Sequence, residues 1–215
     1  MKTKNHLLVT AGPTREMLDP VRFLSNVSTG EMGYQIAHAG KRQGFRVTLI
    51  SGPTNLKQPV GVRVVPVVSA QDMEREVKKY FPGASALVMT AAVCDFTPAK
   101  HQTSKIKRIH THRMVFKQTK DILKSVSNQK RNQYVVGFCL ETEDLKKNAI
   151  RKLRSKNLDL IVANRYGKSQ NPFGKNKTSV LLIDKSLSTK QLTSISKPKF
   201  AGFLVSQIKQ QIKRS

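Results

Sequence analysis

The sequence predicts an α/β fold: a single domain with a mostly parallel β-sheet and helices on both faces. Short apolar runs alternate with segments of helical periodicity along the chain. The apolar runs are continuous rather than alternating, as in parallel strands buried on both faces. With 215 residues, of which 38% are hydrophobic, the chain can bury one sizeable core. One domain over residues 1–215 is therefore expected.

In the first half of the chain, glycine and proline residues separate four runs that are short enough to be strands. The first helical segment closes before Gly44, which suits the end of a helix. The second begins at Ser69, and Asp72 three residues later completes a pattern like a capping box. We expect strands over residues 7–11, 45–50, 62–68 and 86–92, and helices over about 32–42 and from Ser69 to about Tyr80.

The second half continues the alternation and adds two irregular stretches. One covers about residues 97–115 and is rich in lysine and histidine; the other covers about 165–178 and is rich in glycine, asparagine and lysine. Long loops in a compact α/β domain commonly connect elements or cover a ligand, so we expect a flap and a mobile loop. The predicted strands cover residues 135–140, 158–163 and 179–183, and the predicted helices about 143–155 and 200–212.

The net charge of +26, from 39 basic and 13 acidic residues, raises the possibility of nucleic-acid binding. The basic residues, however, are spread over residues 100–215 rather than concentrated in one block. Aromatic residues make up only 6%, without tryptophan, and do not interleave with them as a base-stacking surface requires. An anionic small substrate or a basic host proteome explains the charge equally well, so nucleic acid is the less favoured partner.

Membrane insertion and export are not expected. No apolar run approaches the roughly 20 residues that cross a bilayer. The N-terminal run over residues 7–11 is too short for an export signal. Cys94 and Cys139 have neither metal-ligand spacing nor the number needed for a disulfide framework, so we expect two buried, reduced thiols. A cytoplasmic protein without a membrane partner is the expectation.

Ligands of open parallel sheets bind beyond the carboxyl ends of the strands, so the segments after the strands are candidates for a site. Residues 25–30, Ser-Asn-Val-Ser-Thr-Gly, precede a helix that begins near Glu31. Free N–H groups at a helix start, together with hydroxyl groups, suit a phosphate. An ordinary N-cap loop remains the simpler interpretation, because neither GxxxxGK[ST] nor GxGxxG is present.

Charged residues follow other predicted strands. Asp95 comes just after residues 86–92, where a carboxylate could hold magnesium on a triphosphate or simply cap a turn. Lys105 belongs to a basic KIKR segment that could clamp phosphates or remain a solvated loop. Lys152 and Lys156 are four residues apart in a predicted helix and therefore share one face, which is usually solvated.

Taken together, these segments resemble the phosphopantothenoylcysteine synthetase family. The motifs VTAGPTRE, DPVRFLSN, STGEMG, VTLISGP, AAVCDF, KIKR, VVGFCLETED and KNLDLIVAN occur in the family's order over residues 7 to about 183. The resemblance implies a Rossmann-like fold, a homodimer, and a magnesium-dependent ligase that uses CTP, 4′-phosphopantothenate and cysteine. No flavin is expected, and a flavin-dependent decarboxylase, fused in many bacteria, would be a separate partner.

The resemblance also implies roles for individual residues. Asn26 and Lys105 would be catalytic, with Asn26 handling the acyl-cytidylate and Lys105 on the flap. Arg22, Asn26 and Ser28 would bind the phosphopantothenate substrate, and Asp95 would act through Mg²⁺. The implied nucleotide contacts are Met89, Thr90, Ala91, Asp95, Lys105, Lys120, Asp121, Ile122, Phe138, Lys152 and Lys156.

The chain departs from the family pattern in three places. Glu31 stands where the family often has lysine and reverses a charge beside the predicted phosphate loop. Lys120 replaces a proline, and Cys139-Leu140 replaces two small residues near the expected base. A ligase of the same fold that uses ATP therefore remains an alternative, as does a basic nucleic-acid-binding protein. A redox enzyme on such a sheet is disfavoured, because GxGxxG and an acid after the second strand are missing.

Overall fold

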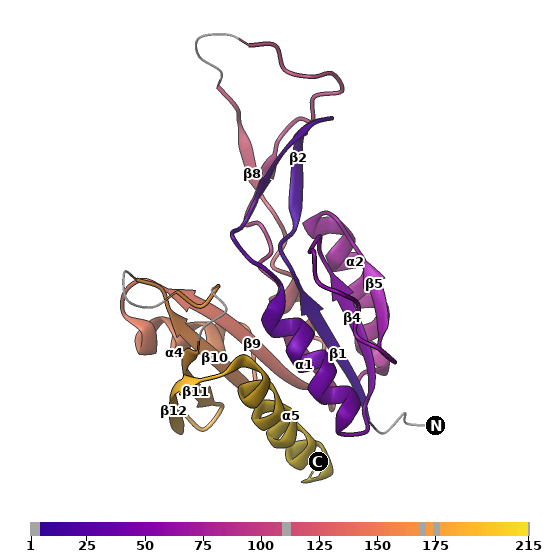
Figure 1. Cartoon of the computed structure of the whole chain (residues 1–215). Helices are drawn as coiled ribbons and strands as arrows, with labels where there is room; N and C mark the ends of the chain where they lie inside the picture. Colours follow the sequence, from indigo (N-terminus) through magenta and orange to yellow (C-terminus); the bar gives the residue numbers. More distant parts are fainter. Residues whose placement is uncertain (1–4, 109–112, 168–170, 174–176, 215) are drawn as a thin grey trace.

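A computed structural model describes residues 5–108, 113–167, 171–173 and 177–214 and contains a central eight-stranded sheet (Figure 1). Its strands are β1 (His6–Ala11), β4 (Arg46–Ser51), β5 (Arg63–Pro66), β6 (Ala86–Met89), β9 (Tyr134–Glu141), β10 (Leu160–Arg165), β11 (Thr178–Asp184) and β12 (Thr189–Ile195). They lie in the order β12-β11-β10-β9-β6-β1-β4-β5. All neighbours from β10 to β5 are parallel, whereas β11 and β12 add antiparallel strands at one edge. The predicted α/β, mostly parallel Rossmann-like sheet is confirmed.

Helices cover both faces of the sheet, as predicted. One face carries α1 (Glu31–Arg42) and α5 (Lys197–Arg214); the other carries α2 (Ala70–Tyr80), α3 (Ile122–Ser127) and α4 (Leu145–Ser155). A short 3-10 turn, η1 (Phe81–Gly83), follows α2. Within the described part of the chain, none of the helices combines the length and the apolar character needed to span a bilayer.

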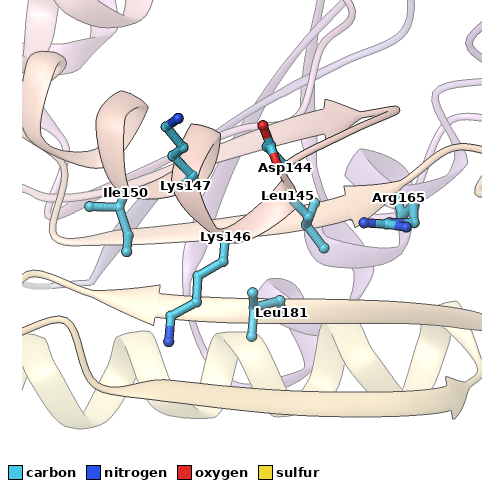
Figure 2. A pocket seen from close by; sticks show the side chains of 7 residues that line it. All are labelled: Asp144, Leu145, Lys146, Lys147, Ile150, Arg165 and Leu181. Atoms are coloured by element: carbon cyan, nitrogen blue, oxygen red, sulfur yellow. The ribbon is translucent and has the colours of Figure 1, made fainter.

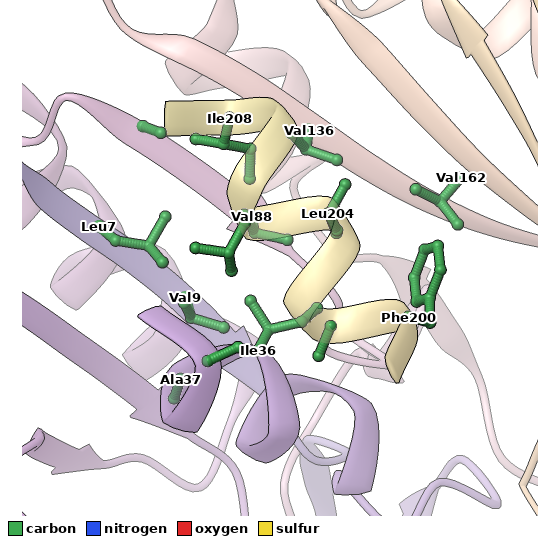
Figure 3. Close-up of a cluster of buried hydrophobic side chains, with 14 of the residues drawn as sticks. Leu7, Val9, Ile36, Ala37, Val88, Val136, Val162, Phe200, Leu204 and Ile208 are labelled. Atoms are coloured by element: carbon green, nitrogen blue, oxygen red, sulfur yellow. The ribbon is translucent and has the colours of Figure 1, made fainter. Parts of the chain in front are cut away.

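Alternation along β1 explains why its apolar run is continuous. Leu7 and Val9 point to the α1/α5 face, whereas Leu8 points to the face covered by the other helices. In Figure 3, Ile36 of α1 and Leu204 of α5 lie on the same side of the sheet as Leu7 and Val9, and all four belong to the first of the two cores. Because both faces are buried, the strand needs no polar positions.

Local signals that were read from the sequence are present at helix ends. The Ser69 hydroxyl accepts a hydrogen bond from the Asp72 N–H at 3.1 Å, and the Asp72 carboxylate accepts one from the Ser69 N–H at 3.1 Å. This reciprocal capping box works with aspartate in place of the usual glutamate or glutamine. Gly44, with φ 84°, follows α1 in the left-handed conformation that stops the helix.

An arm of two antiparallel pairs projects from the sheet and was not predicted (Figure 1). One pair is β2 (Arg15–Asp19) with β3 (Arg22–Ser25), and the other is β7 (Phe96–Pro98) with β8 (Phe116–Gln118). These strands are short; β3 and β8 are largely exposed, and β2 buries the polar residues Glu16 and Asp19, so the four strands lack an apolar pattern. Helix α3 was also missed, because it has only six residues, and strand β12 was missed because it is largely exposed. Residues 109–112 of the predicted flap, and 168–170 and 174–176 of the predicted mobile loop, lie outside the described residues.

Candidate functional site

A cleft of about 1170 Å³ opens at the carboxyl ends of β6, β9 and β10, where an open parallel sheet is expected to bind ligands. Segments far apart in the sequence form its walls because the parallel strands end at the same edge. Of the predicted site residues, all except Arg22 and Lys105 line it: Asn26, Ser28, Met89, Thr90, Ala91, Asp95, Lys120, Asp121, Ile122, Phe138, Lys152 and Lys156.

Asn26 is held by its side-chain amide rather than left free in its loop. The Nδ2 atom donates to the backbone oxygens of Ala92 and Val93, at 3.0 and 3.1 Å. These contacts join the loop after β3 to the segment after β6, although the residues are 66 and 67 positions apart. The residue remains exposed to solvent in the cleft. A pH-independent amide is therefore fixed at the place where the predicted acyl chemistry would occur.

The loop that leads into α1 is pressed against the end of β1. Gly30 occupies the N-cap of α1 with φ 78°, a conformation that favours glycine. A Cβ on Gly33 would come within 2.5 Å of the Cβ of Ala11 and 2.9 Å of the backbone oxygen of Thr10. Both glycines therefore permit the close approach that brings residues 26–33 onto the cleft.

The opposite wall of the cleft contains lysines that are each held by a carboxylate. Lys152 Nζ lies 2.6 Å from Glu141 Oε1, and Lys156 Nζ lies 2.9 Å from Asp121 Oδ2. Asp121 is also the N-cap of α3 and accepts a hydrogen bond from the Lys124 N–H at 3.0 Å. Lys152 lies in the last turn of α4 and Lys156 is the C-cap of this helix, and both line the cleft.

Phe138 and Cys139 are neighbours in β9 but have different surroundings. The Phe138 ring packs edge-on against Phe200, with centroids 6.4 Å apart, and also lines the cleft. Cys139 is buried, and this burial raises its pKa to about 11, so the thiol stays protonated at neutral pH. Burial likewise raises the pKa of Cys94. Both cysteines are thus buried free thiols, as predicted.

Glu31, the departure noted in the phosphate loop, has a partner that the sequence did not reveal. Its Oε2 atom lies 2.6 Å from Nζ of Lys197, which opens α5 and is only 4% exposed. The contact joins residues 166 positions apart. The charge reversal at Glu31 is therefore balanced locally, and Lys197 joins the cleft as a residue that sequence reasoning missed.

Arg22 and Lys105 lie together on the arm instead of in the cleft. The Asp19 carboxylate, whose side chain has no exposed surface, accepts hydrogen bonds from the N–H groups of Val21 and Arg22 at 2.8 Å and of Ile106 at 3.1 Å. The Arg22 guanidinium donates to Asp19 at 3.1 Å and to the backbone oxygen of Ile106 at 3.2 Å. One buried carboxylate thus ties the segment that carries Lys105 to Arg22.

The surroundings of Asp19 favour its charged form. Burial by itself would raise the pKa of Asp19, but hydrogen bonds from the backbone of Val21, Ile106 and Arg22 outweigh it. The nearby Arg22 guanidinium acts in the same direction, and the net pKa lies below the ordinary value for aspartate. The arm therefore depends on an ionised carboxylate at its turn.

The cleft suits a magnesium ion that arrives with a phosphate better than a metal enclosed by protein. Among the residues that the structure describes, no group of three or more histidine, cysteine, aspartate or glutamate side chains could hold a metal. Asp95 is one exposed carboxylate in the cleft wall. Magnesium is often bound by one or two carboxylates plus substrate phosphates and water, so a single aspartate fits that mode.

A second, shallower pocket lies at the start of α4 and contains none of the predicted site residues (Figure 2). In Figure 2, Lys146 and Leu181 face one another across its opening, and Arg165 lies to one side. The pocket has basic side chains but no convergence of polar groups from several strand ends. The cleft at the sheet edge is therefore the candidate site.

Comparison with known proteins agrees with this geometry. The model of one family, the DNA/pantothenate metabolism flavoprotein C-terminal domain, matches residues 2–212. The chain belongs to this family. The match covers the cleft, the arm and both layers of helices, so every part of the candidate site lies within the family's domain.

Several relatives of the chain are named for coenzyme A biosynthesis. The chain is 43% identical over 194 residues to the coenzyme A biosynthesis bifunctional protein CoaBC of Bacillus subtilis (strain 168), covering 89% of this chain and 48% of that protein. It is 43% identical over 164 residues to CoaBC of Escherichia coli (strain K12), covering 74% and 40%. The chain thus spans about half the length, or less, of these curated relatives.

A solved structure supports the fold over nearly the whole chain. The crystal structure of the C-terminal domain of the coenzyme A biosynthesis bifunctional protein CoaBC is 35% identical, with a TM-score of 0.84. The alignment covers 98% of this chain and 97% of that chain. The arm and the sheet are therefore aligned together, rather than the sheet alone.

Proposed function

We propose that this protein is a ligase that joins 4′-phosphopantothenate to cysteine with the consumption of CTP, a step of coenzyme A biosynthesis. The observation that carries the proposal is the convergence of Asn26, Asp95, Lys152 and Lys156 on one cleft. This convergence occurs in a member of a family whose relatives are named for coenzyme A biosynthesis. The reaction would take place in the cytoplasm.

The proposed reaction has two steps. A carboxylate oxygen of 4′-phosphopantothenate attacks the α-phosphorus of CTP, a P–O bond breaks, and pyrophosphate leaves, giving an acyl-cytidylate. The amine of cysteine then attacks the acyl carbon, CMP leaves with the electrons of the C–O bond, and the ammonium proton passes to solvent. The mixed anhydride is needed because a free carboxylate has too basic a leaving group, so two lower barriers replace one high barrier.

The cleft residues would divide this work between them. The Asn26 amide, which donates to two backbone oxygens at the end of β6, would exchange one of them for the acyl oxygen as that oxygen becomes negative. Lys152 and Lys156 would exchange their present carboxylate partners for nucleotide phosphates. Asp95 would hold a magnesium ion on those phosphates, and the ion would neutralise part of their charge. The reaction needs no flavin.

The remaining nucleotide contacts belong to the same proposal. The ends of β6 and α3 surround the position where a base and ribose would lie, beside the Phe138 ring. Cys139 and Leu140, which replace small residues of the family that the chain resembles, also line the cleft. The residues assigned here are Met89, Thr90, Ala91, Lys120, Asp121, Ile122 and Phe138.

For Arg22 and Lys105 we propose action in a homodimer. Neither residue lines the cleft of its own chain, and both belong to the projecting arm. The arm exposes apolar side chains, with Val115 exposed by 74% and Phe23 by 42%. Exposed apolar surface of this kind favours association. Two arms packed together would bring Arg22 and Lys105 of one copy toward the cleft of the other, where Ser28 and Asn26 would bind the same substrate.

The proposal also covers the nucleotide that is used and the enzyme that would act on the product. CTP is the proposed nucleotide, and ATP is the second candidate because of the bulkier residues near the base. A separate flavin-dependent decarboxylase, acting on the product, is the proposed partner reaction. The rival function, nucleic-acid binding through the +26 charge, would be favoured by salt-sensitive duplex binding without any turnover.

The test is incubation with 4′-phosphopantothenate, cysteine and either CTP or ATP, following pyrophosphate and the amide product separately. Wild-type protein should release pyrophosphate with CTP and form one amide for each pyrophosphate. Asn26→Asp should still release pyrophosphate but form the amide about a hundredfold more slowly, because it loses the hydrogen-bond donor to the acyl oxygen. Acyl-cytidylate should then accumulate.

Two results would contradict the assignment. Amide formation by Asn26→Asp at the wild-type rate would remove Asn26 from the chemical step. An absence of pyrophosphate release with both nucleotides would contradict the ligase itself. Ser25→Ala is a matched control, since its hydroxyl donates to the Thr14 backbone oxygen at 2.8 Å and does not line the cleft.

A further inference from the structure

Lys197 is a buried lysine in the wall of the cleft for which the proposed reaction gives no role. It is the first residue of α5, is 4% exposed, and lines the same cleft as Asn26 and Phe138. Lysine is almost never buried to this extent unless it is paired. Its ammonium nitrogen lies 2.6 Å from Glu31 Oε2, so the burial is at least partly compensated by charge.

The position of Lys197 is unfavourable for a group that only stabilises the fold. The first turn of an α-helix carries the positive end of the helix dipole, which disfavours a cation there. Helix α5 has 18 residues and no acidic side chain in its first turn. Apolar residues of α1 and α5, among them Ile36 and Leu204, already pack in one buried core. Well-packed apolar residues often replace a buried ion pair without loss of stability, so stability alone does not explain this pair.

Glu31 places the ammonium of Lys197 beside the loop that precedes α1. Ser28, Thr29 and Gly30 of this loop line the cleft together with Glu31 and Lys197. The carboxylate of Glu31 is 27% exposed, whereas the Lys197 side chain is 4% exposed. Glu31 alone would repel an anion from the loop. Paired with Lys197, it instead orients a cation toward the same part of the cleft.

We propose that Lys197 is a substrate-binding residue, whose ammonium binds a phosphate group held against residues 26–30 and is oriented by Glu31. The inference rests on the proposed function, which supplies two phosphate-bearing ligands for this cleft. Either the triphosphate of CTP or the phosphate of 4′-phosphopantothenate presents the required chemistry. A charge-assisted hydrogen bond from an ammonium to a phosphate oxygen is among the stronger polar contacts in proteins.

The experiment is calorimetric titration of the full chain with CTP, cytidine, 4′-phosphopantothenate, pantothenate and inorganic pyrophosphate. Lys197→Met should weaken binding of one phosphorylated substrate by about tenfold to a hundredfold, as expected for loss of a hydrogen bond to a charged group. Binding of the matching unphosphorylated compound should change by less than about twofold. The affected substrate identifies the source of the phosphate.

Matched variants separate this role from a structural one. Lys199→Met removes an exposed lysine from the same helix turn and should leave every affinity unchanged. Lys197→Arg keeps the charge and should retain most of the phosphate affinity. If Lys197→Met does not fold, the double variant Glu31→Gln/Lys197→Met removes both charges, leaves no unpaired carboxylate, and should show the same selective loss.

Two outcomes overturn the inference: unchanged binding of both phosphorylated substrates, or equal losses with and without the phosphate. Pyrophosphate distinguishes these from failure of the proposed function. If the wild-type protein binds pyrophosphate but neither substrate, the proposed ligase function is contradicted. In that case the inference about Lys197 is supported if Lys197→Met loses affinity for pyrophosphate. It is contradicted if that affinity is unchanged. Wild-type protein that binds none of the five compounds contradicts both.

Discussion

Charged residues are brought together by different interactions in the cleft and in the arm. In the cleft, parallel strands end at one edge and bring together groups that are far apart in sequence, such as Asn26 and Asp95. In the arm, Arg22 and Lys105 are brought together by the turn at Asp19, through contacts that span up to 87 positions. The cleft is thus a consequence of the sheet, whereas in the arm one buried carboxylate joins the segments that carry Arg22 and Lys105.

This difference explains why one chain can form the cleft by itself, whereas the arm would need a second copy to act at a cleft. The cleft walls are formed by elements packed on the sheet, so they are fixed by the two cores. The arm has few buried side chains and projects away from those cores (Figure 1). A residue on the arm can act at a cleft only if another surface orders it there. The proposed homodimer supplies that surface, and the arm can be tested independently of the cleft.

The largest expected effect comes from Lys105→Gln on the arm. Turnover should fall by about a hundredfold or more, because a cation that meets the shifting phosphate charge is lost. The dissociation constant for CTP should rise much less, because Lys105 would act on charge that develops in the transition state, whereas Lys152 and Lys156 would still hold the bound nucleotide. Steady-state kinetics and direct CTP titration together measure the two effects.

Lys107→Gln, an exposed lysine two residues away, is the matched control and should retain wild-type turnover. Equal losses in Lys105→Gln and Lys107→Gln would mean that only the general charge of the segment matters. An unchanged rate in Lys105→Gln would remove this residue from the site and leave the cleft to act alone.

A smaller effect, on stability, is expected for Asp19→Asn. The pKa of Asp19 is lowered in the folded protein, so its charged form stabilises the fold above the unfolded pKa of about 3.9. That contribution is lost as the pH falls through the still lower folded pKa. The melting temperature of Asp19→Asn should therefore lie below that of wild type at pH 7, and the difference should shrink on acidification below about pH 4.

Thermal unfolding of both proteins between pH 7 and pH 3 measures this difference. Asp144→Asn is the control, because Asp144 is an exposed N-cap whose side chain makes no cap hydrogen bond. Its melting temperature should follow that of wild type at each pH. A difference for Asp19→Asn that stays constant with pH would show that the carboxylate's charge does not hold the arm.

Sequence reasoning predicted the cleft far better than the arm, for a physical reason. Strands such as β1 are buried on both faces, so their apolar runs and the polar residues after them could be read directly. The edge where Phe138, Lys152 and Asp95 meet follows from parallel strand order. Arg22 and Lys105 could be read as motif residues, but their position depends on the buried Asp19 turn, which has no periodic signal.

Lys197 shows the same limit within the cleft. It lies three residues before the helix predicted over about residues 200–212, where one lysine among many carries no special pattern. Its partner Glu31 was recognised as a departure beside the phosphate loop, yet the contact between them spans 166 positions. Long-range pairs of single side chains are specified by packing of α1 against α5, and no local sequence rule contains that information.

The smallest expected effect comes from removing basic charge outside both regions. Lys185, Lys213 and Arg214 are exposed and do not line the cleft or belong to the arm. Replacing all three by glutamine lowers the net charge from +26 to +23, since each substitution removes one positive charge. Because exposed charges this far from a ligand are screened within about 8–10 Å by salt, kcat and KM should remain within about twofold of wild type.

Activity assays at low and physiological ionic strength distinguish the two explanations of the charge. If the basic surface only reflects host composition, the triple variant should match wild type at both ionic strengths. A loss of activity that appears only at low salt would show long-range attraction of anionic substrates, which salt weakens. That result would show that the exposed basic surface contributes to substrate binding in addition to the cleft and the arm.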